Sequence, residues 1–338
     1  MRKIRIAQIG MNRYSHAPEI FTTIKLHPEV FDLVGYAVVE DERETCGEKI
    51  QKYFAGYPEL TVEQILNDPS IEAVVIETDE IHLTKYAQMA AQAGKHVHME
   101  KPGSQDLAAF ERLIETVKGN GKVFHIGYMY RYNPVIADVI DQAKRGELGT
   151  VYSVEAHMSR LDPRKTREWF ATFKGGMMFY LGCHLVDIVM QIQGEPTQIL
   201  PLNTCTGMDG VNTEDLGFAV LRYPNGISVI RMGGTEVGGF TRRQLVVCGS
   251  KRTVEIRPLE AIVKDTERKY MLYTEKTEAY IGEDGHTVEE HSRSQNFQRY
   301  EDMLFAFASM VRGERENPYT ADYELSLFRV LLKCCGVE

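Results

Sequence analysis

The sequence is poor in the residues that build cross-linked or membrane-spanning proteins. Its six cysteines follow neither CxxC nor CxxH spacing, so neither a zinc site nor a secreted disulfide framework is indicated. No apolar run reaches the roughly 18 residues of a membrane span. Residues 1–10 enter an apolar strand without the core of a signal peptide. We therefore expect a cytoplasmic protein with no membrane partner.

Dense clusters of lysine and arginine are also absent, and the net charge is -9. Because nucleic-acid phosphates are bound by basic stripes, we expect no nucleic-acid partner. No spacing typical of metal ligands is found, so no metal is expected. What is present is an ordinary globular composition, with 43% hydrophobic and 26% charged residues. A chain of 338 residues exceeds the roughly 250–300 that one core usually serves, so two domains are expected.

The first 127 residues alternate short apolar runs with helical patterns, which is typical of parallel βαβ units. A helix is predicted over 82–93, ending at Gly94, and another from Ser104, as its cap, to about Gly119. The predicted strands cover 4–9, 33–39, 73–77, 96–99 and 123–126. Such a doubly wound sheet binds its ligand outside the carboxyl ends of the strands.

A helix beginning at Pro134 and closing at Gly146 follows, and then the apolar period changes to two. Residues 216–223 and 227–232 flank the turn sequence Pro-Asn-Gly at 224–226, which predicts a hairpin. Further strands are predicted over 151–159, 245–248 and 270–273, with one helix over 184–193. This half is predicted to be an α/β domain with a large, mostly antiparallel sheet.

Helical spacing returns near the C-terminus. The apolar positions there are Phe297, Tyr300, Met303, Leu304 and Phe307, followed by Leu325, Phe328, Val330 and Leu331. The predicted organisation is therefore a doubly wound first domain over 1–127 and a substrate and oligomerisation domain over 128–295. We expect the C-terminal helices, over 296–338, to pack back on the first domain.

The loop after the first predicted strand keeps only the first glycine of the dinucleotide fingerprint G-x-G-x-x-G. Gly10 allows backbone amides to approach a pyrophosphate, and Asn12 can replace the second glycine because asparagine tolerates left-handed conformations. Ser15 or His16 could donate to a phosphate. A plain strand-to-helix turn would explain the same residues equally well.

Acidic residues end the second predicted strand, where this fold holds the ribose hydroxyls of a dinucleotide. Glu40 and Asp41 are the candidates, and no cluster of bases follows them. That favours NAD over NADP, although charged residues after a strand are also often simply solvated.

A stronger signal lies at 94–102, with the sequence GKHVHMEKP. Lys101 ends a buried strand beside Glu100 and before a proline, which predicts a position over the switch point of the sheet. A lysine there can hydrogen-bond a substrate hydroxyl and exchange its proton. The alternative is a surface lysine that merely ends a strand.

The run AGKHVHMEKP at 93–102 resembles the AGKHVxxEKP signature of the glucose-fructose oxidoreductase, inositol dehydrogenase and MocA (Gfo/Idh/MocA) family. Other segments agree in order along the chain: AVVIET at 73–78 followed by His82, GYMYRYNP at 127–134, GELG at 146–149 and GGMMFYLGCHLVD at 175–187.

The resemblance implies a Rossmann domain that holds NAD(H) or NADP(H), followed by a domain whose open sheet commonly forms oligomer contacts. It implies that Lys101 and His184 line the substrate pocket, with His184 acting on the hydroxyl proton while hydride leaves the same carbon. The implied cofactor residues are Gly10, Met11, Asn12, Glu40, Thr78, His82, Glu100 and Lys101. Candidates for a sugar pocket are Tyr128, Arg131, Tyr132 and Trp169, which are otherwise interpreted as interface or surface residues.

Two departures from the family pattern affect these roles. Tyr180 stands four residues before His184, where the family has aspartate. A phenol with a free pKa of about 10 is a poor base at neutral pH, so Tyr180 could serve as an acid, a substrate contact or a wall. Glu77, Asp79 and Glu80 flank Thr78, and carboxylates near an anionic dinucleotide repel it.

The first hypothesis is an NAD(P)-dependent dehydrogenase acting on a secondary alcohol of a sugar, cyclitol or related polyol, with Lys101, His184 and Tyr180 as catalytic residues. The second is a catalytically degenerate relative that binds a sugar-like or nucleotide ligand as a sensor or partner subunit. In either case the expected partner is a second copy of the chain, bound through the sheet of the second domain.

Overall fold

The computed structural model describes residues 2–14, 16–266 and 269–337, without the side chains of residues 264–270. Its contacts divide the chain into two compact units. Unit 1 is Met1–Tyr128 with Tyr300–Leu325, and unit 2 is Met129–Arg299 with Ser326–Glu338. Each unit is described by itself.

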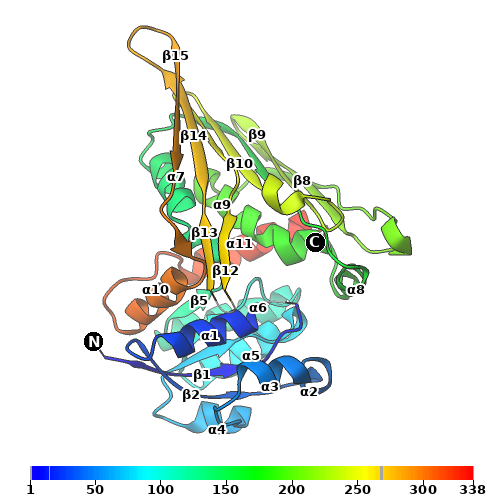
Figure 1. Ribbon diagram of the computed structural model, residues 1–338, viewed down its shortest axis with the longest axis vertical. Helices are drawn as coiled ribbons and strands as arrows, with labels where there is room; N and C mark the ends of the chain where they lie inside the picture. Colours follow the sequence, from blue (N-terminus) through cyan, green and yellow to red (C-terminus); the bar gives the residue numbers. More distant parts are fainter. Residues whose placement is uncertain (1, 15, 267–268, 338) are drawn as a thin grey trace. The chain divides into compact units, whose positions relative to one another are not determined.

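Unit 1 is built on a five-stranded parallel sheet in the order β2-β1-β3-β4-β5. Figure 1 labels β1, β2 and β5 of this sheet. The strands are β1 (Ile4–Ile9), β2 (Phe31–Ala37), β3 (Ala73–Ile76), β4 (His96–Met99) and β5 (Phe124–Ile126). The doubly wound parallel sheet predicted from the sequence is confirmed, and β1 and β4 have the predicted bounds. The strand order reverses at β1 and β3, so the carboxyl ends of these two strands form the switch point.

Helices connect the strands of unit 1. They are α1 (Ala17–Leu26), α2 (Glu42–Thr45), α3 (Gly47–Tyr53), α4 (Val62–Asn67), α5 (Glu80–Gln92) and α6 (Leu107–Asn120), and α10 (Glu301–Val311) belongs to the same unit. Helix α1 packs against α3, and α5 packs against α6. Helix α5 starts two residues before the predicted position 82 and is followed by Gly94 at φ 69°, as its stop signal predicted.

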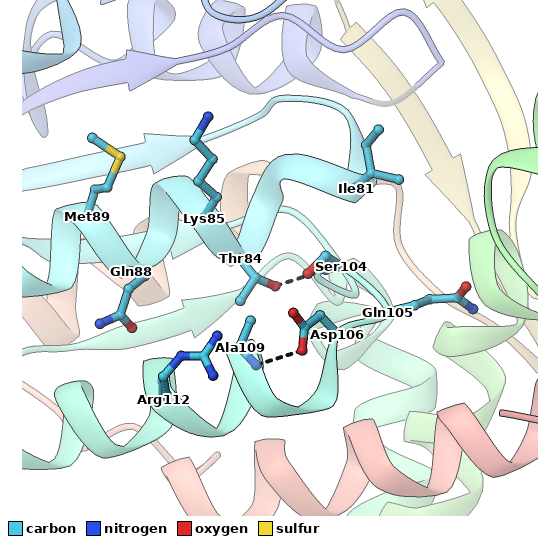
Figure 2. A pocket seen from close by; sticks show the side chains of 10 residues that line it. All are labelled: Ile81, Thr84, Lys85, Gln88, Met89, Ser104, Gln105, Asp106, Ala109 and Arg112. Carbon is cyan, nitrogen blue, oxygen red and sulfur yellow. Dashed lines mark hydrogen bonds between the residues drawn. The ribbon is translucent and has the colours of Figure 1, made fainter. Parts of the chain in front are cut away.

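The predicted cap of α6 is wrong. Asp106, not Ser104, caps the helix, because the Asp106 carboxylate accepts a hydrogen bond from the Ala109 amide at 2.9 Å (Figure 2). The Ser104 amide instead donates to Thr84 Oγ1 at 2.9 Å, which ties the loop after β4 to α5. The helix ends at Gly121, whose φ is 61°, and so runs past the predicted Gly119.

Unit 2 contains an eight-stranded sheet in the order β15-β14-β11-β10-β6-β9-β8-β7 and a three-stranded sheet in the order β12-β13-β16. The strands are β6 (Val151–His157), β7 (Gln198–Pro201), β8 (Leu216–Tyr223), β9 (Gly226–Gly233), β10 (Gln244–Gly249), β11 (Arg252–Ile256), β12 (Ala261–Thr266), β13 (Lys269–Tyr273), β14 (Glu275–Ile281), β15 (Thr287–Arg293) and β16 (Phe297–Gln298). In the large sheet β6 and β9 pair in parallel, and the other described pairs are antiparallel. The mostly antiparallel sheet predicted from the sequence is therefore confirmed.

The Pro-Asn-Gly hairpin of unit 2 is also confirmed. Tyr223 pairs with Gly226, so Pro224 and Asn225 form the turn between β8 and β9. A side chain at Gly226 would place its Cβ 1.7 Å from the Tyr152 carbonyl oxygen, which explains the glycine. Helix α7 (Pro134–Lys144) packs on β11, and α9 (Cys183–Gln193) packs on β6 and β9, as predicted for the helix near 184–193. Helix α8 (Arg164–Trp169) belongs to the same unit.

The helical interpretation of Phe297 is wrong. Phe297 pairs with Leu272 of β13 in strand β16, and α10 begins only at Glu301. The first apolar residue of the predicted helix, Phe297, therefore pairs with a distant strand. Local periodicity in the sequence does not reveal such a long-range contact. Helix α11 (Ala321–Cys334) is divided, with residues 321–325 in unit 1 and residues 326–334 in unit 2. No helix within the described residues is both long enough and apolar enough to cross a membrane.

Candidate functional site

The loop after β1 lies against the end of β3 in unit 1. Gly10 has a φ of 97°, and a Cβ there would lie 2.6 Å from the Thr78 backbone nitrogen. Only glycine fits this approach. Asn12 fixes the loop further, because its Nδ2 donates to the Thr78 carbonyl at 3.1 Å and its Oδ1 accepts from the Tyr14 amide at 2.7 Å. Asn12 does not adopt a positive φ, so it does not imitate the backbone of the second glycine as the sequence predicted.

Met11 has a different role from its neighbours. Its side chain is fully buried in a cluster with Phe21, Tyr36 and Phe54. Only the backbone of Met11 is therefore available to a ligand of the loop. Ser15, a predicted phosphate donor, lies outside the described residues.

A recess at the switch point brings predicted cofactor residues together. Met11, Asn12, Glu40, Thr78 and His82 line it, together with Arg13, Asp41, Glu42 and Asp79. Gly10 does not line the recess, but its backbone lies close to Thr78, which does. Of the cofactor residues that the family resemblance implied, all but Gly10, Glu100 and Lys101 thus line one recess of unit 1.

Glu40 stands at the acidic end of β2 with a φ of 51°. Its Oε1 accepts hydrogen bonds from Lys85 Nζ at 2.6 Å and from the Tyr86 hydroxyl at 2.8 Å. These two hydrogen bonds hold the pKa of Glu40 below its usual range. Glu40 is therefore an ionised carboxylate at the position where a Rossmann fold binds ribose hydroxyls.

Carboxyl groups are buried beneath the recess, around Lys101. Glu77 and Glu80 are 0% exposed, and Glu100 and Lys101 are 2% exposed. Lys101 Nζ lies 3.6 Å from Glu100 Oε1, and Asn12 Nδ2 donates to Glu80 Oε2 at 2.9 Å. A Cβ at Gly127 would meet Glu100 Oε2 at 2.8 Å, so this glycine makes room for the carboxyl group.

Burial dominates the protonation of these acids. Burial raises the pKa of Glu80 to about 8 and that of Glu100 to about 7, although the Lys101 charge opposes both shifts. The pKa of Glu77 is raised well above its usual range, by burial and then by the charge of Glu100. Glu42, on the wall of the recess, is 3% exposed, and burial raises its pKa to about 7.

Two histidines that sequence reasoning missed lie next to this cluster. The Nδ1 atoms of His98 and His125 are 2.7 Å apart, and His98 Nε2 lies 3.9 Å from Glu77 Oε1. Burial lowers the pKa of His98 to about 3, so this side chain is neutral and does not balance the carboxyl groups. The sequence signal for the pair was the alternation of histidine with apolar residues on adjacent buried strands.

His184 belongs to unit 2, at the start of α9, and is 2% exposed. Its ring meets the Tyr130 ring edge-on, with centroids 5.1 Å apart. The Tyr130 hydroxyl donates to Glu260 Oε1 at 2.8 Å and accepts from Arg243 Nη1 at 3.1 Å. Burial and the charge of Glu260 raise the pKa of Tyr130, so its hydroxyl stays protonated beside His184.

Tyr180 lies in a π-helical turn, Met178–Gly182, that leads into α9. Its ring meets Trp169 edge-on at 5.1 Å between centroids and lies 5.6 Å from Phe170. The guanidinium carbon of Arg160 is 5.1 Å from the Tyr180 ring centroid, and Arg160 Nε is 2.7 Å from Asp162 Oδ1. The phenol is thus enclosed by aromatic rings and one cation.

The predicted sugar-binding residues are distributed over both units. Tyr128 is 1% exposed in unit 1, whereas Arg131, Tyr132 and Trp169 belong to unit 2. Arg131 donates from Nε and Nη2 to the two carboxylate oxygens of Asp187, at 2.9 and 2.8 Å. This buried pair gives Arg131 a structural role that spacing alone did not predict.

A separate groove of about 590 Å³ lies between α5 and α6, lined by residues that include Ile81, Lys85, Met89 and Arg112 (Figure 2). None of the predicted site residues lines it. Predicted cofactor residues line the smaller recess at the switch point instead. Among the described residues, no group of three or more histidine, cysteine or acidic side chains is arranged to hold a metal ion.

Comparison with known protein families identifies both units. Residues 4–128 match the model of an oxidoreductase family with an NAD-binding Rossmann fold, and residues 136–255 match the Gfo/Idh/MocA C-terminal domain. The chain belongs to the Gfo/Idh/MocA oxidoreductase family. Its first unit is thus an NAD-binding Rossmann domain, as the sequence motifs predicted.

Relatives in this family are distant. The chain is 27% identical to the uncharacterized oxidoreductase ORF334 of Rhizobium meliloti over 58% of each chain. It is 23% identical to the myo-inositol 2-dehydrogenase of Thermotoga maritima over 78% of this chain and 79% of that protein.

Solved structures share the fold. A putative NADPH-dependent oxidoreductase from Desulfitobacterium hafniense superposes with a TM-score of 0.80 at 18% identity, covering 99% of this chain and 95% of that one. A levoglucosan dehydrogenase in complex with NADH and levoglucosan has a TM-score of 0.76 at 16% identity, covering 99% and 98% of the two chains.

Proposed function

We propose that this family member is an NAD(P)-dependent dehydrogenase that moves a hydride between a nicotinamide cofactor and a secondary alcohol of a sugar, cyclitol or related polyol. The observation that carries the proposal is the buried Lys101–Glu100 pair directly after β4 of the Rossmann domain. Lys101 also interacts electrostatically with Glu80, which is hydrogen-bonded to Asn12 of the recess. The names of relatives agree, since they include an inositol dehydrogenase and a levoglucosan dehydrogenase bound to NADH.

Two features of the recess would suit a dinucleotide, namely the close backbone approach at Gly10 and the carboxylate of Glu40. Gly10 at positive φ brings the loop close to Thr78 without a side chain in the way, and the ionised Glu40 can accept ribose hydroxyls. When bound, the cofactor would accept or return the hydride. Lys101 would hold the substrate hydroxyl, and His184 would take its proton at a ring nitrogen or return it.

We propose NAD as the preferred cofactor. The 2′-phosphate of NADP would approach the Glu40 carboxylate, whose hydrogen bonds from Lys85 and Tyr86 already hold it in its charged form. Two like charges about 4 Å apart near a protein surface disfavour binding by about 1–2 kcal/mol or more. The dissociation constant of NADP should therefore be roughly tenfold higher than that of NAD.

The test is a fluorescence titration of the purified protein with NADH and with NADPH. NADH should bind at least tenfold more tightly, and Glu40→Gln should narrow that difference, with the exposed Glu63→Gln as a matched control. A polyol screen with Lys101→Ala as its blank then tests turnover. Failure of both cofactors to bind at millimolar concentration would refute the dehydrogenase assignment.

A second candidate is a relative that binds its ligands without turnover. It is favoured by Tyr180, which replaces the family's aspartate and is enclosed by Trp169 and Arg160. Cofactor binding together with inactivity on the whole polyol screen would support this candidate.

We also propose that a second copy of the chain covers the open face of the large sheet. On that face the partly exposed side chains of Leu200, Val220 and Val229 are cross-strand neighbours, whereas the alternate positions Ala219, Leu221 and Ile230 are fully buried. Contiguous apolar surface of this kind is typical of an oligomer contact.

A further inference from the structure

The acids around Lys101 outnumber the positive charges available to them. Glu77 comes from the end of β3, Glu80 from the start of α5, and Glu100 from the end of β4, and all three interact electrostatically with Lys101. His98 is neutral and contributes no charge. One ammonium group cannot balance three buried carboxylates, so protons must remain on the cluster near neutral pH.

Hydrogen bonding supports this protonation. Neither oxygen of the fully buried Glu77 has a hydrogen-bond partner among the described residues, and the same is true of Oε1 of Glu80. A buried carboxylate without partners is far more costly than a buried carboxylic acid. Asp79, whose negative charge raises the pKa of Glu80 further, stands next to it in the chain.

Glu80 is connected to the recess through one side chain. Asn12 Nδ2 donates both to Glu80 Oε2 and to the carbonyl of Thr78, and Asn12 and Thr78 line the recess. A pyrophosphate bound there would add negative charge one side chain away from Glu80. Arg13, a cation that lines the recess, is already shared between Asp41 at 3.1 Å and Asp79 at 3.8 Å.

We propose that binding of the dinucleotide is coupled to proton uptake by Glu80, so that affinity for the cofactor falls as the pH rises. This inference rests on the cofactor proposed above. The coupling follows from linkage, because the bound anion favours the neutral acid and the neutral acid favours the bound anion in equal measure. Carboxylates at this turn are therefore compatible with an anionic ligand as long as they hold protons.

The pKa of Glu80 in the ligand-free protein determines the pH at which affinity for the cofactor begins to fall. Below about pH 8, the pKa of Glu80 in the absence of ligand, the group already holds its proton and the affinity is constant. Above that pH, each unit weakens binding by up to about tenfold until the pKa of the complex is reached. If Glu42, with a pKa of about 7, were the group that takes up the proton, the affinity would begin to fall one pH unit lower.

The experiment is a titration of the full-length protein with NADH between pH 6.5 and 9.5, followed by nicotinamide fluorescence. NADH is suitable because its phosphodiester groups do not titrate in this range. Calorimetry in two buffers of different ionisation enthalpy measures proton uptake directly and needs no variant. The variants are Glu80→Gln, which imitates the protonated acid and keeps an acceptor for Asn12, and Glu42→Gln as the comparison.

We expect the dissociation constant of the unmodified protein to rise between pH 8 and pH 9.5 by roughly tenfold, with net proton uptake on binding. Glu80→Gln should bind at pH 9.5 as tightly as at pH 6.5, while Glu42→Gln keeps the decline above pH 8. Equal affinity of the unmodified protein for NADH at pH 6.5 and pH 9.5, without proton uptake, overturns the proposal. The proposal is also overturned if Glu42→Gln removes the fall in affinity and Glu80→Gln does not. Absence of NADH binding at every pH, in all forms, refutes the proposed function and this inference together, whereas pH-independent binding refutes only the inference.

Discussion

The buried ion pair of unit 2 gives a stability prediction that can be calculated from its geometry. Arg131 and Asp187 are joined by two hydrogen bonds of 2.8 and 2.9 Å, and their side chains are 0% and 1% exposed. Gln191 adds a third hydrogen bond to Asp187 at 2.9 Å. Removing one partner of such a pair leaves an uncompensated charge in the interior, which costs about 3–5 kcal/mol. Asp187→Asn should therefore destabilise unit 2 by about that amount.

The assay is urea unfolding followed by the fluorescence of Trp169, the single tryptophan of the sequence. Trp169 belongs to unit 2 and contacts Phe173 and Tyr180, so its emission reports the loss of packing there. With a slope of about 2 kcal/mol/M, the midpoint should fall by roughly 2 M.

A matched control is the exposed pair Arg145–Glu147, whose side chains are 55% and 48% exposed at a separation of 2.6 Å. Glu147→Gln should cost far less than Asp187→Asn, because water and salt screen exposed charges. If Asp187→Asn is no more destabilising than Glu147→Gln, the reasoning from burial is refuted. The double variant Arg131→Met with Asp187→Leu should recover much of the loss, since it leaves no buried charge.

Three further changes test other parts of the structure. Gly10→Ala places a Cβ 2.6 Å from the Thr78 nitrogen at a φ of 97°, so thermal unfolding should show a loss of about 2–4 kcal/mol and NADH titration a weaker site. Glu42 is neutral in the fold up to about pH 7 but ionises above about 4.5 when unfolded, so stability falls as pH rises between these values. Glu42→Gln should therefore equal the unmodified protein near pH 4.5 and exceed it at pH 8 by up to about 3 kcal/mol in urea unfolding followed by circular dichroism. Val220→Glu on the open sheet face should shift the protein to a smaller species in analytical ultracentrifugation, whereas unchanged mass would contradict the oligomer proposal.

Local signals in the sequence predicted those elements whose cause is local. Strands β1 and β4 have the predicted bounds because the residue type changes where each strand ends, to Gly10 after β1 and to Glu100 after β4. The β8–β9 hairpin was predictable from its turn residues alone. The predicted cap of α6 was wrong, because the Ser104 amide binds Thr84 in a tertiary contact and Asp106 caps the helix.

The candidate site was predictable in its grouping but not in its charges. The motif positions Asn12, Glu40, Thr78 and His82 do line one recess. In contrast, the pairing of Arg131 with Asp187 joins residues 56 positions apart, and no spacing rule reveals it. Electrostatic partners of this kind depend on which faces of two helical segments meet.

The burial of the acids around Lys101 shows how the missing information could have been found. In the sequence, Glu77 and Glu80 have the pattern of a solvated turn, because acidic residues after a strand are usually exposed. Two glycines contradict that interpretation, since Gly10 allows the loop after β1 to cover Thr78, and Gly127 leaves space for Glu100. Gly10 directly follows β1 and Gly127 directly follows β5, and at both positions the missing Cβ leaves room for groups at the ends of the neighbouring strands β3 and β4. A glycine after a strand should accordingly be considered together with the charged residues that follow neighbouring strands, because the space it leaves determines whether those charges are solvated or must hold protons.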